Sequence, residues 1–220
     1  MGVGEHDMRY LIILIFYFSV PSISSIAQDR KNYFPIWSYH QSNLNIHGIS
    51  IGLGAFNFDP KNTFTNGIRV GLIGAGILAP LMPGDPTAND KEQFDKIMSS
   101  PLSERINGIN LVGGGSMCDC KINGLSLGFI GHSTIQNNGI SAAGFINYTQ
   151  VHNGTQASIF SSGAYKMGGL QVGLFNNAKK SWGIQIGLVN DSEVMYGLQF
   201  GLWNVNQKRK LPIFNWNFKK

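Results

Sequence analysis

Two serines lie in the pattern Gly-x-Ser-x-Gly that surrounds the nucleophile of α/β hydrolases. Ser50 lies in Gly48-Ile49-Ser50-Ile51-Gly52, and Ser126 lies in Gly124-Leu125-Ser126-Leu127-Gly128. A hydrolase nucleophile requires a sharp turn from a strand into a helix, and no helical pattern follows either serine. We therefore expect both serines to be structural.

Cys118 and Cys120 are the only cysteines in the chain. Residues two apart on a strand point the same way but lie about 6–7 Å apart, so a disulfide between them requires a turn. An exported chain oxidises its thiols, whereas a metal site would need two further ligands, and His132 is the only histidine nearby in sequence. We expect a structural pair, bridged or free, rather than a metal or redox centre.

No other set of residues has the spacing of a catalytic or binding site. His40, His47 and His152 show no metal-ligand spacing, and the carboxylates outside one insertion are scattered singly. The glycine-rich run at 71–76 lacks both the Gly-x-Gly-x-x-Gly spacing and the βαβ unit of a dinucleotide site. The sequence therefore predicts no catalytic residues, no cofactor-binding residues, no metal ligands, and no enzymatic activity.

A short repeat organises most of the chain: Gly, apolar, polar, apolar, small, apolar. The clearest copies begin at Gly169, Gly183 and Gly197, 14 residues apart. Earlier copies, 15 or 16 residues apart, begin at Gly108, Gly124, Gly139 and Gly154, and outlying copies begin at Gly48 and Gly67. A fixed period over most of a chain indicates a repeat architecture.

Within each copy, apolar and polar residues alternate with period two, which predicts a β-strand. In one copy Leu170, Val172 and Leu174 point one way, and Gln171 and Gly173 point the other way. The polar column holds Ser50, Arg69, Asn110, Ser126, Ser141, Gln156, Gln171, Gln185 and Gln199. Extending two copies to their flanking aromatics predicts strands over Trp182 to Val189 and Tyr196 to Trp203. The polar stretches 176–180, 190–193 and 204–207 are then the turns.

Two all-β architectures fit this pattern. The favoured one is an antiparallel up-and-down meander closed as an outer-membrane β-barrel of roughly ten strands, with the apolar column facing lipid. In the alternative, a β-solenoid, the apolar column is a dry interior and the glutamines form an outer amide ladder. The six residues after each copy contain no second apolar column, which favours the barrel.

The domain organisation follows from the N-terminus and one interruption. Arg9, the apolar run from Leu11 to Val20 and the small-x-small site Ser25-Ile26-Ala27 predict a signal peptide over residues 1–27. Residues 28–220 then form a single β-repeat domain with a loop and helix insertion at about 73–106. Within the insertion, 90–99 is expected to be a short helix with Phe94 on its apolar face.

The net charge of +5 is accompanied by no pattern typical of nucleic-acid binding. Basic residues occur in predicted connections, such as Lys179-Lys180 and Lys208-Arg209-Lys210, rather than along one face with interleaved aromatics. We therefore do not expect nucleic acid as a partner.

The last copies also resemble a known family. Gly-Leu-Gln-Val-Gly-Leu-Phe-Asn, Gly-Ile-Gln-Ile-Gly-Leu-Val-Asn and Gly-Leu-Gln-Phe-Gly-Leu-Trp-Asn, between Gly169 and Asn204, resemble uncharacterised bacterial surface-repeat proteins. In those proteins a Gly-apolar-Gln-apolar-Gly-Leu-x-Asn phrase recurs about every 14 residues. The resemblance implies export to the bacterial outer membrane or cell surface, and it implies no activity or functional residues.

These observations together predict an exported envelope or surface protein of structural or interaction type. Outer-membrane lipid is the expected partner, and a surface ligand of unknown identity is a further possibility. The alternative is a secreted β-repeat binding module for a glycan or a protein surface.

Overall fold

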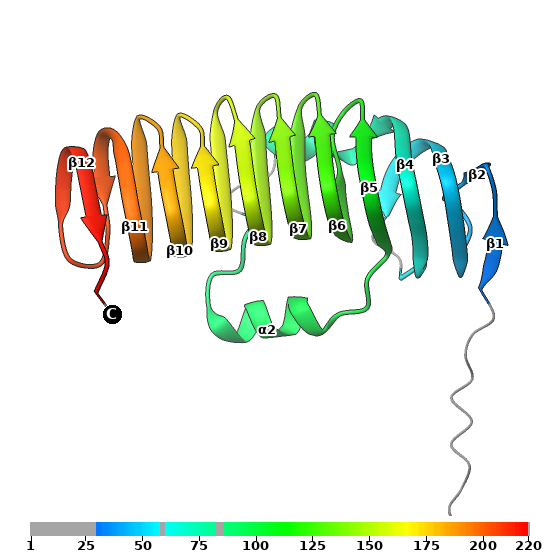
Figure 1. Cartoon of the computed structure of the whole chain (residues 1–220), viewed down its shortest axis with the longest axis horizontal. Coiled ribbons are helices and arrows are strands. Elements are labelled where there is room, and N and C mark those ends of the chain that lie inside the picture. Colours follow the sequence, from blue (N-terminus) through cyan, green and yellow to red (C-terminus); the bar gives the residue numbers. More distant parts are fainter. Residues whose placement is uncertain (1–29, 58–59, 82–85, 220) are drawn as a thin grey trace, which may run out of the picture.

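The chain folds into a β-solenoid in which each sequence repeat forms one coil (Figure 1). The structure is a computed structural model that describes residues 30–57, 60–81 and 86–219. The elements are β1 (Lys31–Tyr33), β2 (Ile36–Ser38), β3 (Leu44–Asn57), β4 (Thr63–Gly74), the 3-10 helix η1 (Ala75–Leu81), α2 (Lys91–Ser99), β5 (Glu104–Val112), β6 (Met117–Gly128), β7 (Gly131–Ala143), β8 (Ile146–Ser158), β9 (Ser161–Val172), β10 (Phe175–Ile186), β11 (Val189–Val205) and β12 (Lys210–Asn217). The predicted signal peptide lies outside the described residues.

Successive coils pair in parallel and in register. Gly169 of β9 lies opposite Gly183 of β10, and Gly183 lies opposite Gly197 of β11. At one end β1 and β2 pair with β3, and at the other end β12 pairs with β11 in antiparallel orientation and caps the stack. The expected antiparallel barrel was therefore wrong, because neighbouring repeats run parallel and the sheet ends at β1 and β12.

The repeated glycine explains why the strands form coils. Gly183 has a φ of +141°, which favours glycine, and a Cβ at this position would lie 1.9 Å from the carbonyl oxygen of Gly169. The bend at this glycine lets one long strand wrap around the molecule. The equivalent glycines of the other coils, from Gly48 to Gly197, also have positive φ values.

Much of the interior of the solenoid is polar, beside smaller apolar clusters such as the one around Ile106 and Ile122. Gln171, Gln185 and Gln199 are completely buried and form a ladder along the axis, in which Gln185 donates to Gln171 at 2.7 Å and Gln199 donates to Gln185 at 2.8 Å. A second interior ladder runs from Asn176 through Asn190 to Asn204, with both bonds at 2.7 Å.

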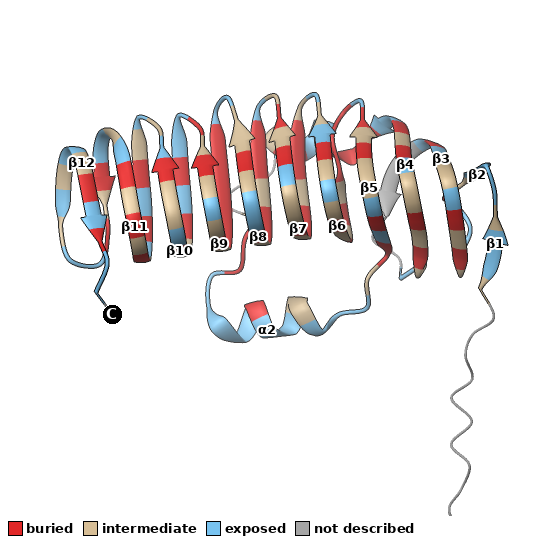
Figure 2. Ribbon diagram, in the orientation of Figure 1, coloured by how far each residue is buried: buried red, intermediate tan, exposed pale blue. Residues whose placement is uncertain are grey.

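The apolar column therefore faces outward, as Ile186 and Phe200 illustrate. The solenoid alternative was right about the fold and wrong about its faces, because the glutamines lie inside it. Figure 2 shows buried and exposed residues alternating along each coil.

Two of the three predicted turns were also wrong, and the third, 204–207, is correct only for residues 206–207, which lie between β11 and β12. Residues 176–180 lie inside β10, residues 190–193 lie inside β11, and the breaks between strands fall at Gly173-Leu174 and Gly187-Leu188. Since inward-facing Asn176 and Ala178 are small or polar, this half of each coil lacks the apolar signal that normally reveals a buried strand face.

The insertion leaves the solenoid after β4 and returns at β5. Its helix is confirmed as α2, whose N-cap residue Asp90 accepts a hydrogen bond from the backbone N–H of Gln93 at 2.8 Å. Phe94 packs on Tyr165 with ring centroids 4.2 Å apart. This contact fixes α2 along the lower edge of the coils (Figure 1).

Cys118 and Cys120 form a disulfide within β6, with their Cα atoms 5.2 Å apart. The register between β6 and β7 shifts between Cys118 and Lys121, and this irregularity supplies the bend that the bridge requires. The bridge packs in the interior with Ile106 and Ile122, so it is structural, as expected.

Candidate functional site

The structure brings Ser126 close to a histidine. The Oγ atom of Ser126 lies 3.4 Å from Nε2 of His132, and the backbone N–H of Ser116 donates to Nδ1 of the same ring at 3.1 Å. Burial lowers the pKa of His132 to about 4, so the ring is neutral at pH 7. A neutral ring that accepts at Nδ1 carries its proton on Nε2, and therefore Nε2 has no free lone pair with which to remove the proton of Ser126.

Ser126 and His132 are also fully inside the solenoid, with exposed fractions of 0 % and 1 %. Asn110 donates to the Oγ atoms of both Ser116 and Ser126 at 2.9 Å. Ser50, the other candidate serine, is equally buried. The arrangement acts as an interior hydrogen-bond network rather than an accessible nucleophile.

A buried ion pair lies next to this network. The guanidinium of Arg69 lies 2.8 Å from Oε2 of Glu104, donates to Oδ1 of Asn110 at 3.0 Å, and lies 4.1 Å from the ring centroid of Tyr39. Burial raises the pKa of Tyr39, Arg69 opposes the shift, and Glu104 adds to it. The ion pair could not be predicted from the sequence, because the insertion separates the two charged residues along the chain.

The remaining predicted candidates are not brought together. His152 lies inside the solenoid, and burial lowers its pKa to about 4, whereas His40 and His47 are exposed. Within residues 30–57, 60–81 and 86–219, no group of three or more His, Cys, Asp and Glu side chains is arranged to hold a metal ion.

The exterior, unlike the interior network, presents side chains that a partner could reach. At the upper edge, where one coil passes to the next, most coils expose a large apolar side chain. We call these residues the apolar ridge: Leu53, Leu72, Phe129, Ile159, Leu174, Leu188 and Leu202. Phe129 is 83 % exposed and Leu53 is 71 % exposed, so the ridge consists of protruding side chains.

Two adjoining apolar hollows lie beside the ridge, with volumes of 580 and 700 Å³. Both are lined by Gly128, Phe129, Gly144 and Ile159, among other residues. They form where glycine and alanine replace the larger residues of the other coils, as at Ala142.

The lower edge of the coils is polar. Five asparagines, each directly before the repeat glycine, form an exterior ladder: Asn66, Asn107, Asn123, Asn138 and Asn153. Each of the last four donates to the one before it, at 2.7 to 2.8 Å. Sequence reasoning missed this ladder, although five successive Asn-Gly pairs were the signal that would have revealed it.

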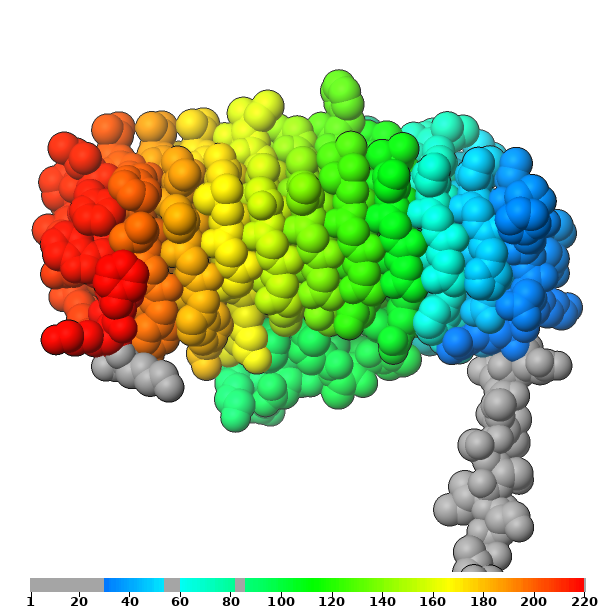
Figure 3. Space-filling view, viewed as in Figure 1, coloured from blue at the N-terminus to red at the C-terminus, as the bar shows by residue number. Residues whose placement is uncertain are grey.

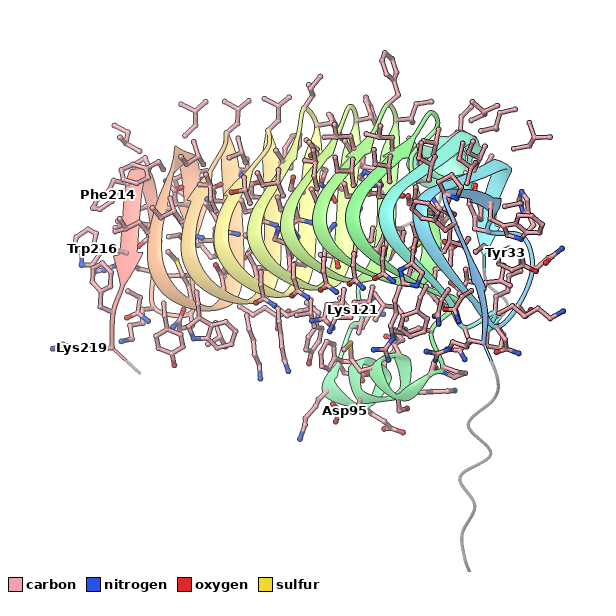
Figure 4. The ribbon with its side chains drawn as sticks, turned by 45° about the vertical axis from the view of Figure 1, so that its right-hand side comes forward. Tyr33, Asp95, Lys121, Phe214, Trp216 and Lys219 are labelled. Carbon is pink, nitrogen blue, oxygen red and sulfur yellow. A yellow bond between two sulfur atoms is a disulfide. The ribbon has the colours of Figure 1, made fainter. Side chains whose placement is uncertain are left out.

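The two edges have opposite character. Figure 4 shows carbon-only side chains along the upper edge, and it places Lys121 on the lower edge, on the same side as α2 and its Asp95. The register aligns Lys121 with Arg105 of β5. The molecule is therefore amphipathic across its width rather than along its length.

Comparison with known proteins adds no relative: no protein-family model, no curated protein and no solved structure matches this chain. The resemblance to bacterial surface-repeat proteins therefore remains a prediction. None of the helices in the described part of the chain has the length and apolar character needed to cross a membrane.

Proposed function

We propose that the protein is an exported, non-catalytic binding module that docks on a lipid surface of the bacterial envelope through its apolar ridge. The observation that carries this proposal is the ridge itself, in which most coils place one large apolar side chain at the same edge. Contiguous exposed apolar surface on a soluble fold marks a membrane or protein interaction site.

The shape of the ridge favours lipid over a second rigid protein. A row of protruding side chains enters a fluid interface readily, whereas a rigid partner would need a matching groove. The hollows beside Phe129 are lined by apolar residues such as Leu72 and Leu127, and they offer space for acyl chains between the protruding residues.

The surroundings of the ridge support the same partner. Trp203, next to Leu202 in the last coil, is 46 % exposed, and tryptophan prefers the interface between lipid and water. The net charge of +5 steers the chain toward an anionic surface only at long range, because the attraction falls off within about a Debye length. The lysines of the lower edge would remain in water when the ridge is buried.

The absence of catalysis is part of the proposal. It is supported by the proton on Nε2 of His132, which leaves Ser126 without a base, and by the complete burial of both residues.

Vesicle flotation tests the docking. The mature chain should float with vesicles that contain anionic lipid, and the double variant Leu188→Ser/Leu202→Ser should remain at the bottom of the gradient. Both leucines are exposed, so the fold should survive the change. Trp182→Ala is the matched control, because it removes an exposed apolar side chain from the lower edge and should float like the wild type.

Two results would reject the proposal. One is a wild-type chain that does not float with any vesicle. The other is a wild-type dimer that the double variant converts to a monomer without any vesicle binding, since the ridge would then be a contact between two copies.

A further inference from the structure

The residues directly before the repeat glycines form one exterior column that runs through nearly the whole solenoid. Its side chains are amides in the earlier coils and aromatic rings in the later coils. The register aligns the ladder asparagines from Asn66 to Asn153 with Gly168 of β9, then with Trp182 of β10 and Tyr196 of β11. Five amides are thus followed by a position without a side chain and then by two aromatic rings. We call this column the amide–aromatic track.

The aromatic end of the track is an open platform. The rings of Trp182 and Tyr196 are stacked, with centroids 6.1 Å apart and an interplanar angle of 16°, and Trp182 is 46 % exposed. Gly168 has no side chain that could cover the neighbouring ring of Trp182, although a Cβ at this position would lie only 3.1 Å from Oδ1 of Asn153. Such a platform suits the C–H face of a sugar ring, because an aromatic face attracts weakly positive hydrogens.

The amide end supplies hydrogen-bond donors at a regular interval. A side-chain amide has two N–H donors, and the ladder uses one of them, as in the bond from Asn123 to Asn107 at 2.8 Å. One donor per coil is then left for a ligand, and coils repeat about every 4.8 Å. This interval suits a linear polymer lying along the axis better than a compact ligand.

Cations line the track on one side. Arg105, Lys121 and Lys180 each lie two residues before a track position, and the register places Arg105 beside Lys121. Lys166 lies beside Lys180 in the same column, but its Nζ atom packs on the ring of Phe94 in α2, 4.4 Å from the centroid. Arg30 adds a further cation near the first coils, where its guanidinium lies 3.9 Å from the ring centroid of Phe64.

Acidic groups are also present on this side. Asp90 and Asp95 lie in the α2 segment near Tyr165, and Asp119 lies two residues before Lys121, where burial raises the pKa of its carboxyl group. Glu193 is paired with Lys179, and Glu104 is turned inward to Arg69. The helix α2, which carries Asp95, lies below the middle coils, and the coils of β10 and β11, which carry the aromatic end of the track, extend beyond it (Figure 3).

We infer that the amide–aromatic track binds a linear anionic polysaccharide. Its carboxylate or sulfate groups pair with the cations, its hydroxyl groups accept from the asparagine amides, and one sugar ring stacks on Trp182. This site lies on the lower edge, so it does not depend on the proposed docking of the ridge.

Affinity measurements with defined probes test the inference. The mature chain should bind polygalacturonate or heparin at low salt, more tightly than neutral dextran, and binding should weaken as salt screens the charges. Trp182→Ala should lower the affinity about tenfold, the size of effect expected for an exposed aromatic anchor. The double variant Arg105→Gln/Lys121→Gln should weaken binding and flatten the salt dependence.

The controls separate this site from the ridge and from general charge attraction. Lys208→Gln removes a cation from the C-terminal cap, and Leu188→Ser/Leu202→Ser alters the ridge, so both variants should bind the polysaccharide like the wild type. Circular dichroism and thermal melting should show that every variant is folded, because all the altered side chains lie on the exterior.

Two outcomes would overturn the inference. In one, the wild type binds none of the anionic polysaccharides. In the other, it binds single-stranded poly(dT) as well as the polysaccharides and Trp182→Ala changes neither affinity, so that only nonspecific charge attraction remains.

Discussion

The side-chain amide of Gln185 donates a hydrogen bond to Oε1 of Gln171 across 2.7 Å, and both side chains are completely buried. The same carbonyl of Gln185 accepts from Gln199 at 2.8 Å and from Ser192 at 2.9 Å. Because each glutamine bonds to the equivalent glutamine of the next coil, the ladder holds successive coils in register. A polar interior thus performs the role that an apolar core performs in most domains.

Replacing Gln185 by leucine should destabilise the fold by about 3 kcal/mol, because buried donors on Gln199 and Ser192 would lose their acceptor. Gln185→Ser should also be costly, since it breaks the same bonds and leaves a cavity. Ile186→Ser is the control: this neighbour is 43 % exposed, so its change should be small. Chemical denaturation of the three variants would contradict the ladder's role if Gln185→Leu matched the control.

Gly187→Leu should prevent stable folding. A Cβ at Gly187 would lie 2.1 Å from the carbonyl oxygen of Gly173 and 2.5 Å from Nδ2 of Asn176, so the neighbouring coil would have to move. Gly168→Ala is the control, because its added Cβ meets only Oδ1 of Asn153, at 3.1 Å. Thermal unfolding should show a large loss for the first variant and a small change for the second, and equal midpoints would contradict the close stacking of the coils.

The glutamine face of this solenoid lies inside, so the crowding at Gly187 is a property of the stacked coils. A large loss for Gly187→Leu therefore does not by itself distinguish a solenoid from a narrow barrel.

The period of the repeat and the alternation within it could be predicted from the sequence, and they were sufficient for the all-β class. The direction of the faces could not be predicted, because hydropathy identifies a core only when the core is apolar. In this protein Gln185 is buried and Ile186 is exposed. The rule that apolar side chains face the core and polar side chains face solvent therefore assigns both residues to the wrong side of the solenoid. Parallel pairing was hidden for a related reason: the polar half of each coil, such as Asn176 to Lys180, resembled a turn.

Of the exterior sites, the sequence identified the aromatic residues Trp182 and Tyr196 but not their alignment with the asparagines. This alignment depends on the register between coils. The register is set by the repeat glycines, which lie opposite one another in neighbouring coils, as Gly183 lies opposite Gly169. Once the fold is parallel, every residue before a repeat glycine lies in one column. The Asn-Gly pairs then become a surface feature rather than a set of turns.

Arg69→Met should destabilise the protein by about 3–5 kcal/mol, because it leaves the buried carboxylate of Glu104 without its partner. The double variant Arg69→Met/Glu104→Met should recover much of this loss, since an apolar pair requires no charge in the interior. Denaturant unfolding of both variants measures the difference. A double variant no more stable than Arg69→Met would contradict the assignment of the cost to an unpaired charge.

The protein should lose stability in acid because of its buried histidines. Burial lowers the pKa of His132 and of His152 to about 4, from an ordinary value of 6.5. A folded-state pKa below the unfolded one means that the unfolded chain binds the proton first. The contribution of each histidine is therefore complete above pH 6.5 and is lost as the pH falls toward 4. Each shift corresponds to roughly 3 kcal/mol, because one pKa unit is worth about 1.4 kcal/mol.

His132→Asn should remove about half of this acid sensitivity without disrupting the interior. The register places His132 opposite Asn147 in the next coil, and an asparagine carbonyl can accept the bond from the backbone N–H of Ser116. Adding His152→Met should remove most of the remainder, since the next coil already has Met167 at that position. Unfolding free energies of the wild type and both variants, measured from pH 7.5 to 4, should give successively flatter curves. If the double variant loses as much stability as the wild type over this range, buried histidines are not the cause.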